Sequence, residues 1–230
     1  NDIGGLPITK EGHLAGIITE SDLFKLFIEL FGARRKGIRA TLLLPEKKGL
    51  KSMSAFTWDV FNGDADGICA LMQLRLAQPK NSRLITGVKR DIALLDRVEA
   101  RAGDQVTVLD VSLDKNRDHL HRILNEGADV FYVDHHFAGD IPNSSSLTTL
   151  INEAPDVCTS LLVNHYLEDA YKQWAIVGSF GDNLNKSAHG LAKSQSLSNL
   201  ELAQLERLGI LLNYNGYGAD LDDLHYHPAD

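Results

Sequence analysis

The sequence predicts an α/β fold in which a parallel sheet is flanked by helices, preceded by a small N-terminal β-β-α fragment. From residue 58 onward, short apolar strand patterns alternate with helix patterns, which is typical of parallel sheets with right-handed helical crossovers. Acidic residues recur directly after the strand patterns, where open α/β sheets bind ligands. Of the 230 residues, 43% are apolar, which is ample for a packed α/β core.

The N-terminal fragment begins with two short strand patterns, at residues 6–8 and 14–18, joined by a polar turn. A helix is expected to follow, because Thr19 or Ser21 can serve as its N-cap and apolar residues then recur at helical spacing. Gly32 is the expected stop signal of this helix.

Residues 6–27 resemble the last strand-strand-helix unit of a CBS domain. The resemblance implies that Thr19 and Asp22 contact the ribose of an adenosine nucleotide. A CBS domain works as a pair of motifs, and residues 6–27 are expected to supply only the end of one such motif. A structural remnant without a ligand is therefore the preferred interpretation of this fragment.

Residues 37–49 form an expected exposed strand, which resembles the opening strand of an ACT domain. Met53 then precedes the first strand of the main domain, so a natural start at this methionine is plausible. We expect two parts: residues 1–52 as a partial CBS- and ACT-like fragment, and residues 53–230 as the main domain.

The main domain is assigned element by element from runs of apolar residues and their spacing. Short β-type runs predict strands at residues 58–61, 82–86, 105–109 and 129–133, and the apolar segment 174–180 is interpreted as a further strand. Helices are predicted at residues 68–76, 92–99, 116–126 and 159–170. The polar and aromatic residues 212–228 are expected to form an ordered loop.

Carboxylates follow these strand patterns at four places. The first strand runs into Asp64 and Asp66, and a helix pattern begins directly after them. The other three places hold Asp110, then Asp134 with His135 and His136, and finally Asp182. Because the carboxyl ends of parallel strands meet at one edge of a sheet, we expect these side chains to lie together.

Carboxylate and imidazole groups suit hard or borderline divalent ions. Five Asp and two His imply about two ions that share a bridging carboxylate, an arrangement that serves phosphoryl transfer. Imidazole shifts the expected ion towards Mn²⁺, with Mg²⁺ or Co²⁺ as substitutes. A structural Ca²⁺ site is the weaker interpretation, because Ca²⁺ prefers shells made of oxygen alone.

The order of these motifs resembles that of the DHH phosphoesterase superfamily. Asp-x-Asp, a later strand-end Asp, Asp-His-His and Gly-Asp follow one another between residues 60 and 183. The superfamily includes RecJ-type single-strand exonucleases, oligoribonucleases, cyclic-dinucleotide phosphodiesterases and family II inorganic pyrophosphatases. Its members usually carry a second, substrate-binding domain after the metal domain, and we expect this chain to lack it.

The resemblance assigns the metal ligands position by position. Asp64 would bind the first metal and Asp66 the second. Asp110 would bridge the two ions. His135 and Asp182 would complete the shell of the second metal.

The resemblance also implies roles for residues beside the metals. His136 would face the substrate phosphate, and Asp134 would orient the histidines; with Asp110, these are the predicted catalytic residues. Many members have a His two residues before the first Asp, where this chain has Asn62. The side-chain oxygen of Asn62 could still bind the first metal. Lys89 could contact phosphate, but a solvated helix start is the preferred interpretation.

The expected function is divalent-metal-dependent hydrolysis of phosphodiester bonds in single-stranded or short oligonucleotides, or in small nucleotides, by two-metal activation of water. A pyrophosphatase-like hydrolase of phosphoanhydrides is one alternative. A regulatory module that binds nucleotide and metal without turnover is another. Clustered carboxylates repel one another and destabilise a fold, so a module without turnover would have little physical reason to retain them.

Composition limits the partners and the location. A net charge of −8 argues against a broad footprint for duplex nucleic acid, which usually needs a basic face. No stretch approaches a membrane-spanning helix and no signal peptide is evident, so a cytoplasmic location without membrane contact is expected. A homodimer is left open.

Overall fold

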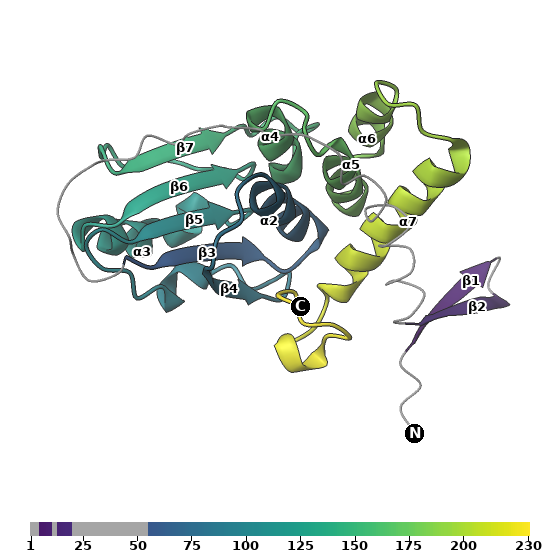
Figure 1. The fold of residues 1–230 in the computed structure, drawn as a ribbon. Helices are drawn as coiled ribbons and strands as arrows, with labels where there is room; N and C mark the ends of the chain where they lie inside the picture. Colours follow the sequence, from purple (N-terminus) through teal and green to yellow (C-terminus); the bar gives the residue numbers. More distant parts are fainter. Residues whose placement is uncertain (1–4, 11–12, 20–54) are drawn as a thin grey trace.

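The α/β architecture predicted from the sequence is confirmed. The computed structural model describes residues 5–10, 13–19 and 55–230. Its main sheet contains the strands β3 (Thr57–Asn62), β4 (Arg83–Gly87), β5 (Gln105–Leu109), β6 (Asp129–Asp134) and β7 (Leu147–Ile151). These strands are ordered β4-β3-β5-β6-β7, and every neighbouring pair is parallel. All five carboxyl ends therefore lie at one edge (Figure 1).

Helices cover both faces of this sheet. The helices that follow β3 are α2 (Ala65–Ala77), α3 (Leu113–Asn125), α4 (Thr159–Tyr166), α5 (Lys172–Gly181), α6 (Asn185–Ala192) and α7 (Asn199–Asn215), with the 3₁₀ turns η1 (Leu94–Arg97) and η2 (Leu221–Asp223). One apolar cluster packs α3 and η1 against one face of the sheet, and a second packs α2 and α4 against the other. A third cluster joins α2 to α5, α6 and α7, which extend away from the sheet (Figure 1).

The N-terminal strands are confirmed as an antiparallel hairpin of β1 (Gly5–Lys10) and β2 (His13–Thr19). Thr19 is the last residue of β2. Asp22, the expected helix after it and the strand at 37–49 lie outside the described residues. The CBS and ACT resemblances and the domain boundary remain predictions.

The helix predicted at residues 92–99 is wrong, because the segment is a loop with one 3₁₀ turn. Side chains of α3 bind backbone groups that a helix would pair internally. Asn116 accepts from the N–H of Leu95 at 3.2 Å and donates to the carbonyl of Ile92 at 2.6 Å. Arg122 donates to the carbonyls of Leu95 and Val98. The loop is thus held by long-range partners rather than by its own helical bonds.

Two further assignments need correction. Residues 174–180 belong to the helix α5 and not to a strand, and their apolar side chains are buried against α2, α6 and α7. The expected loop at 212–228 begins four residues too early, because α7 continues to Asn215. None of the helices in the described ranges combines the length and apolar character needed to cross a membrane.

Candidate metal centre

Asp64 lies in the tight turn between β3 and α2, and Asp66 lies in the first turn of α2. Asp64 is the N-cap of α2, and its Oδ1 accepts from the backbone N–H groups of Asp66 and Gly67 at 3.0 and 3.2 Å. A Cβ at residue 67 would lie 2.2 Å from the backbone oxygen of Asn62, so the close approach of the start of α2 to the end of β3 requires glycine there. The local sequence therefore fixes both buried carboxylates at the edge of the sheet.

Asp110 follows β5 with a φ of 58°, a left-handed conformation that Asp tolerates better than most residues. Its carboxylate is buried, and its Oδ1 accepts from the hydroxyl of Thr159, the first residue of α4, at 3.2 Å. Non-glycine residues with such backbone angles concentrate at functional sites. The turn directs Asp110 into the cluster at the strand ends.

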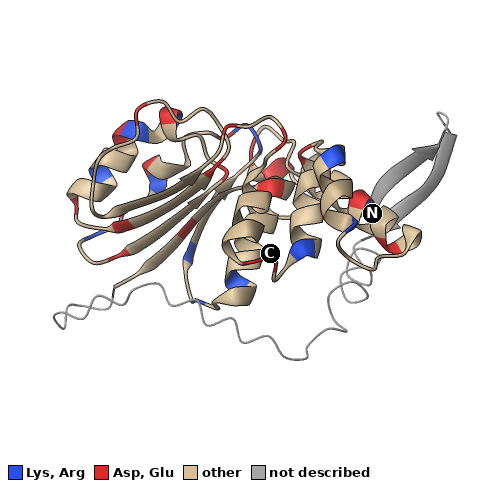
Figure 2. Ribbon diagram, turned by 90° about the horizontal axis from the view of Figure 1, so that it is seen from above, with Lys and Arg blue, Asp and Glu red and all other residues tan. Residues whose placement is uncertain are grey.

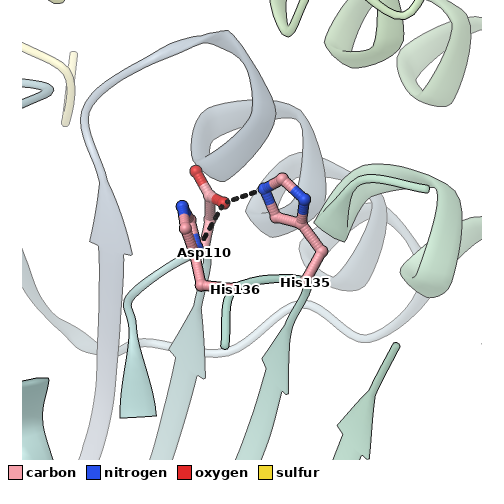
Figure 3. Close-up of side chains that lie close together, drawn as sticks. All are labelled: Asp110, His135 and His136. Atoms are coloured by element: carbon pink, nitrogen blue, oxygen red, sulfur yellow. Dashed lines mark ion pairs between the residues drawn. The ribbon is translucent and has the colours of Figure 1, made fainter. Parts of the chain in front are cut away.

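The Asp-His-His segment lies at the end of β6, beside Asp110. Figure 3 shows both imidazole rings beside the Asp110 carboxylate. His135 Nε2 lies 3.4 Å from Asp110 Oδ1. His136 Nδ1 lies 3.9 Å from the same oxygen and 2.7 Å from Asp134 Oδ1. Asp134 thus contacts His136, whereas His135 is directed at Asp110, and the orienting role of Asp134 stays a prediction.

Asp182 reaches the cluster from a helix end and not from a strand. It is the C-cap of α5, so three strands and one helix supply the carboxylates instead of the four predicted strands. Its Oδ2 lies 3.8 Å from His135 Nε2, and Asp66 Oδ2 lies 4.0 Å from the same nitrogen. The prediction that Asp182 joins the cluster is correct although its element was assigned wrongly.

Two groups among the described residues could hold a divalent ion, and His135 belongs to both. One contains Asp110, His135 and His136; the other contains Asp66, His135 and Asp182. One carboxylate oxygen of each of Asp66, Asp110 and Asp182 lies within 4.0 Å of His135 Nε2. Three carboxylates and one imidazole are a suitable donor set for one borderline divalent ion.

The electrostatics of the cluster favour the binding of a cation. Burial, together with the neighbouring Asp64 and Asp66 carboxylates, raises the pKa of Asp110 well above its usual value. Burial and Asp66 raise the pKa of Asp182 to about 6. Oδ2 of the buried Asp134 has no hydrogen-bond partner within the described part of the chain. A cation would relieve this excess of negative charge, so the residues fit a divalent ion.

Metal binding should release a proton from His135. Burial lowers the pKa of this imidazole, but the hydrogen bond to Asp110 and the charges of Asp66, Asp110 and Asp182 outweigh it and raise the pKa to about 10. The ring is therefore protonated near neutral pH, and a metal ligand must be neutral. Affinity should rise about tenfold per pH unit between about pH 7 and 8.5.

Calorimetric titration with Mn²⁺ in two buffers of different ionisation enthalpy measures this release. At about pH 7.5 we expect about one proton per bound ion. A binding heat that is the same in both buffers would contradict the prediction.

Asp66 also holds the beginning of α4. Its Oδ2 accepts from the N–H of Thr159 at 2.7 Å, and its Oδ1 accepts from the N–H of Ser160 at 2.8 Å. These two N–H groups lie in the first turn of the helix and would otherwise be buried without partners. One carboxylate thus serves both the fold and the candidate ion site.

Asp66→Asn should therefore destabilise even the metal-free protein. The amide NH₂ would face one of the two backbone donors, leaving it unsatisfied at a cost of about 1–3 kcal/mol. Urea unfolding in the presence of a chelator measures the loss. Asp118→Asn, on an exposed position of α3, is the matched control and should change little. Equal stability of the two variants would refute the dual role.

Lys89 is a site residue that sequence reasoning assigned to a solvated position. Its Nζ lies 2.5 Å from Asp64 Oδ2 and donates to Asn213 Oδ1 at 2.8 Å. Burial lowers the pKa of this ammonium group, but the Asp64 carboxylate outweighs burial and raises it. The signal in the sequence was a lysine three residues after the strand pattern at 82–86, a strand that the structure places beside the one leading to Asp64.

Both the oxygen and the nitrogen of the Asn62 side-chain amide form hydrogen bonds with backbone groups. Its Oδ1 accepts from the N–H of Asp64 at 3.1 Å, and its Nδ2 donates to the carbonyl of Lys89 at 3.3 Å. Asn62 lies outside both groups of described residues that could hold an ion. Its predicted role as a ligand stays a prediction, while the structure shows it joining two loops.

Comparison with family models gave no match, and neither did comparison with curated proteins. Solved structures gave several matches. A structure described as the DHH domain of a member of a family of ribosomal proteins matches with a TM-score of 0.52 and 13% identity, over 69% of this chain and 47% of that chain. This likeness shows that the chain has the fold of a DHH domain.

Two structures of exonuclease RecJ also match, with lower scores. RecJ bound to manganese has a TM-score of 0.45 and 21% identity, over 70% of this chain and 48% of that chain. RecJ from Thermus thermophilus, in complex with Mn²⁺, has a TM-score of 0.40 and 16% identity, over 69% of this chain and 34% of that chain. The match thus spans less than half the length of each of these proteins.

Proposed function

We propose that this chain is a divalent-metal-dependent phosphoesterase that hydrolyses phosphodiester bonds of single-stranded or short oligonucleotides, or of small nucleotides. The observation that carries the proposal is the convergence of Asp66, Asp110 and Asp182 on His135 Nε2, within 4.0 Å, beside the exposed ring of His136. The fold of a DHH domain supports the same class of chemistry.

In this proposal one set of residues holds the ion and another contacts the substrate. A divalent ion at this centre would activate a water and neutralise phosphate charge. Asp66, Asp110, His135 and Asp182 would hold it. Asp134 accepts from His136 Nδ1 at 2.7 Å, which fixes that proton and leaves Nε2 of the ring for a phosphate oxygen or a proton transfer.

The charge distribution favours a small or single-stranded substrate. Figure 2 shows basic and acidic residues interspersed along the described chain. The net charge is −8, so a long duplex would be repelled, whereas a short anion needs only the local field of a bound cation. The mixed carboxylate and imidazole donors favour Mn²⁺, with Mg²⁺ or Co²⁺ as substitutes.

The proposal is tested with a labelled short single-stranded oligonucleotide incubated with the protein and Mn²⁺. Parallel reactions contain Mg²⁺, a chelator, duplex DNA of the same sequence, or pyrophosphate. We expect cleavage of the single strand that depends on the divalent ion. Binding of Mn²⁺ without turnover of any phosphate ester would overturn the proposal in favour of a binding module, and turnover of pyrophosphate alone would favour the phosphoanhydride alternative.

A further inference from the structure

The negative charge of the Asp64 carboxylate is already paired with the ammonium group of Lys89. Its Oδ1 caps α2 by accepting from two backbone N–H groups, and its Oδ2 contacts Lys89 Nζ at 2.5 Å. Asp64 belongs to neither of the two groups of described residues that could hold an ion. The carboxylate expected to bind a first metal is therefore neutralised by a side chain of the protein.

Both the backbone and the ammonium group of Lys89 are held by other parts of the protein. Its backbone N–H donates to the carbonyl of Gly216 at 2.8 Å, and its own carbonyl accepts from Asn62 Nδ2 at 3.3 Å. Its ammonium donates to Asn213 Oδ1 at 2.8 Å and lies 5.9 Å from the centre of the Tyr217 ring. A surface lysine that met Asp64 by chance would lack these restraints on both its backbone and its ammonium group.

The ammonium also lies next to the ion site centred on His135. Lys89 Nζ is 4.0 Å from Asp182 Oδ1, while the other oxygen of Asp182, Oδ2, is 3.8 Å from His135 Nε2. Asp182 thus lies between two sites that can hold a positive charge. One is formed by donors that suit a divalent ion, and Lys89 fills the other.

We infer that Lys89 replaces one cation of the predicted pair, so that the centre binds a single divalent ion, at His135, beside a fixed ammonium group. An ion between Asp64 and Asp182 would meet the positive charge of Lys89 and would have to break its bonds to Asp64 and Asn213. The inference rests on the metal-binding part of the proposed function and is independent of the reaction catalysed.

Metal content of the full chain tests the inference without an activity assay. Protein freed of metal, loaded with Mn²⁺ and desalted should retain about one ion per chain, with the paramagnetic resonance spectrum of an isolated ion. Lys89→Met keeps the length of the side chain and removes its charge, which frees Asp64 Oδ2. This variant should retain about two ions, about 4 Å apart, with an exchange-coupled spectrum.

Lys172→Met is the matched control, because Lys172 forms a partly buried ion pair with Asp169, Nζ to Oδ2 3.0 Å, outside the centre. It should retain one ion. Two ions in the unaltered protein would overturn the inference and leave the proposed function standing. One ion in both the unaltered protein and Lys89→Met would also overturn it. Absence of any bound ion in the unaltered protein would overturn both the inference and the metal-binding part of the proposed function.

Discussion

Asp110→Asn should lower metal-dependent turnover by at least about 10³-fold, since even the loss of outer-shell partners of a metal typically costs about 10–100-fold. Asp110 Oδ1 lies 3.4 Å from His135 Nε2 and belongs to one of the candidate ligand groups. Asparagine keeps the size of the side chain and tolerates the positive φ of 58° at this position. The substitution therefore removes the charge with little backbone strain.

Initial rates on the short single-stranded oligonucleotide, with Mn²⁺ in excess, measure this loss. Asp118→Asn makes the same chemical change at an exposed position of α3 and should keep full activity. Thermal unfolding shows whether each variant is folded. A folded Asp110→Asn protein with activity within about tenfold of the unaltered chain would exclude Asp110 as a ligand.

Arg75→Met should destabilise the protein by about 3–5 kcal/mol, the typical cost of leaving a buried charge without its partner. Asp59 lies inside β3 with a fully buried side chain. Arg75 from α2 contacts both of its carboxylate oxygens, with Nε donating to Oδ2 at 2.6 Å, and the hydroxyl of Ser82 donates to Oδ2 at 2.6 Å. Without Arg75, the hydroxyl of Ser82 would be the remaining side-chain hydrogen-bond donor to this carboxylate among the described residues.

Urea unfolding of the metal-free protein measures this cost. Asp59→Asn combined with Arg75→Met should recover part of the loss, because the unpaired charge is then gone. Lys115→Met breaks a pair with Asp114 whose lysine is 60% exposed, and should cost less than about 1 kcal/mol. Equal losses for Arg75→Met and Lys115→Met would contradict the argument.

The strands of the sheet could be predicted where their side chains are buried on both faces. Residues 58–61, 105–109 and 129–133 are short, mostly apolar segments of strand length, and each coincides with a strand. The strand β7, Leu147–Ile151, was missed. It is one of the two edge strands of the sheet and is partly exposed, and its two adjacent threonines leave no clear apolar run.

Helices were misjudged where tertiary contacts override the local pattern. The apolar residues 174–180 show no helical period, because neighbouring helices bury α5 on most of its sides. Residues 92–99 have helical spacing, yet Asn116 and Arg122 of α3 take their backbone hydrogen bonds. A local pattern cannot report partners that lie more than twenty residues away.

The sequence by itself determined that Asp64, Asp66, Asp110 and the Asp-His-His segment meet at one place, because parallel strands bring their carboxyl ends to the same edge. Only the tertiary structure decided that Asp182 approaches from the end of a helix and that Lys89 neutralises Asp64. The position of Lys89 depends on the loop after β4 packing against the end of α7, where Asn213 and Gly216 bind it. The periodicity of the chain carries no information about that contact, since it joins residues more than one hundred positions apart.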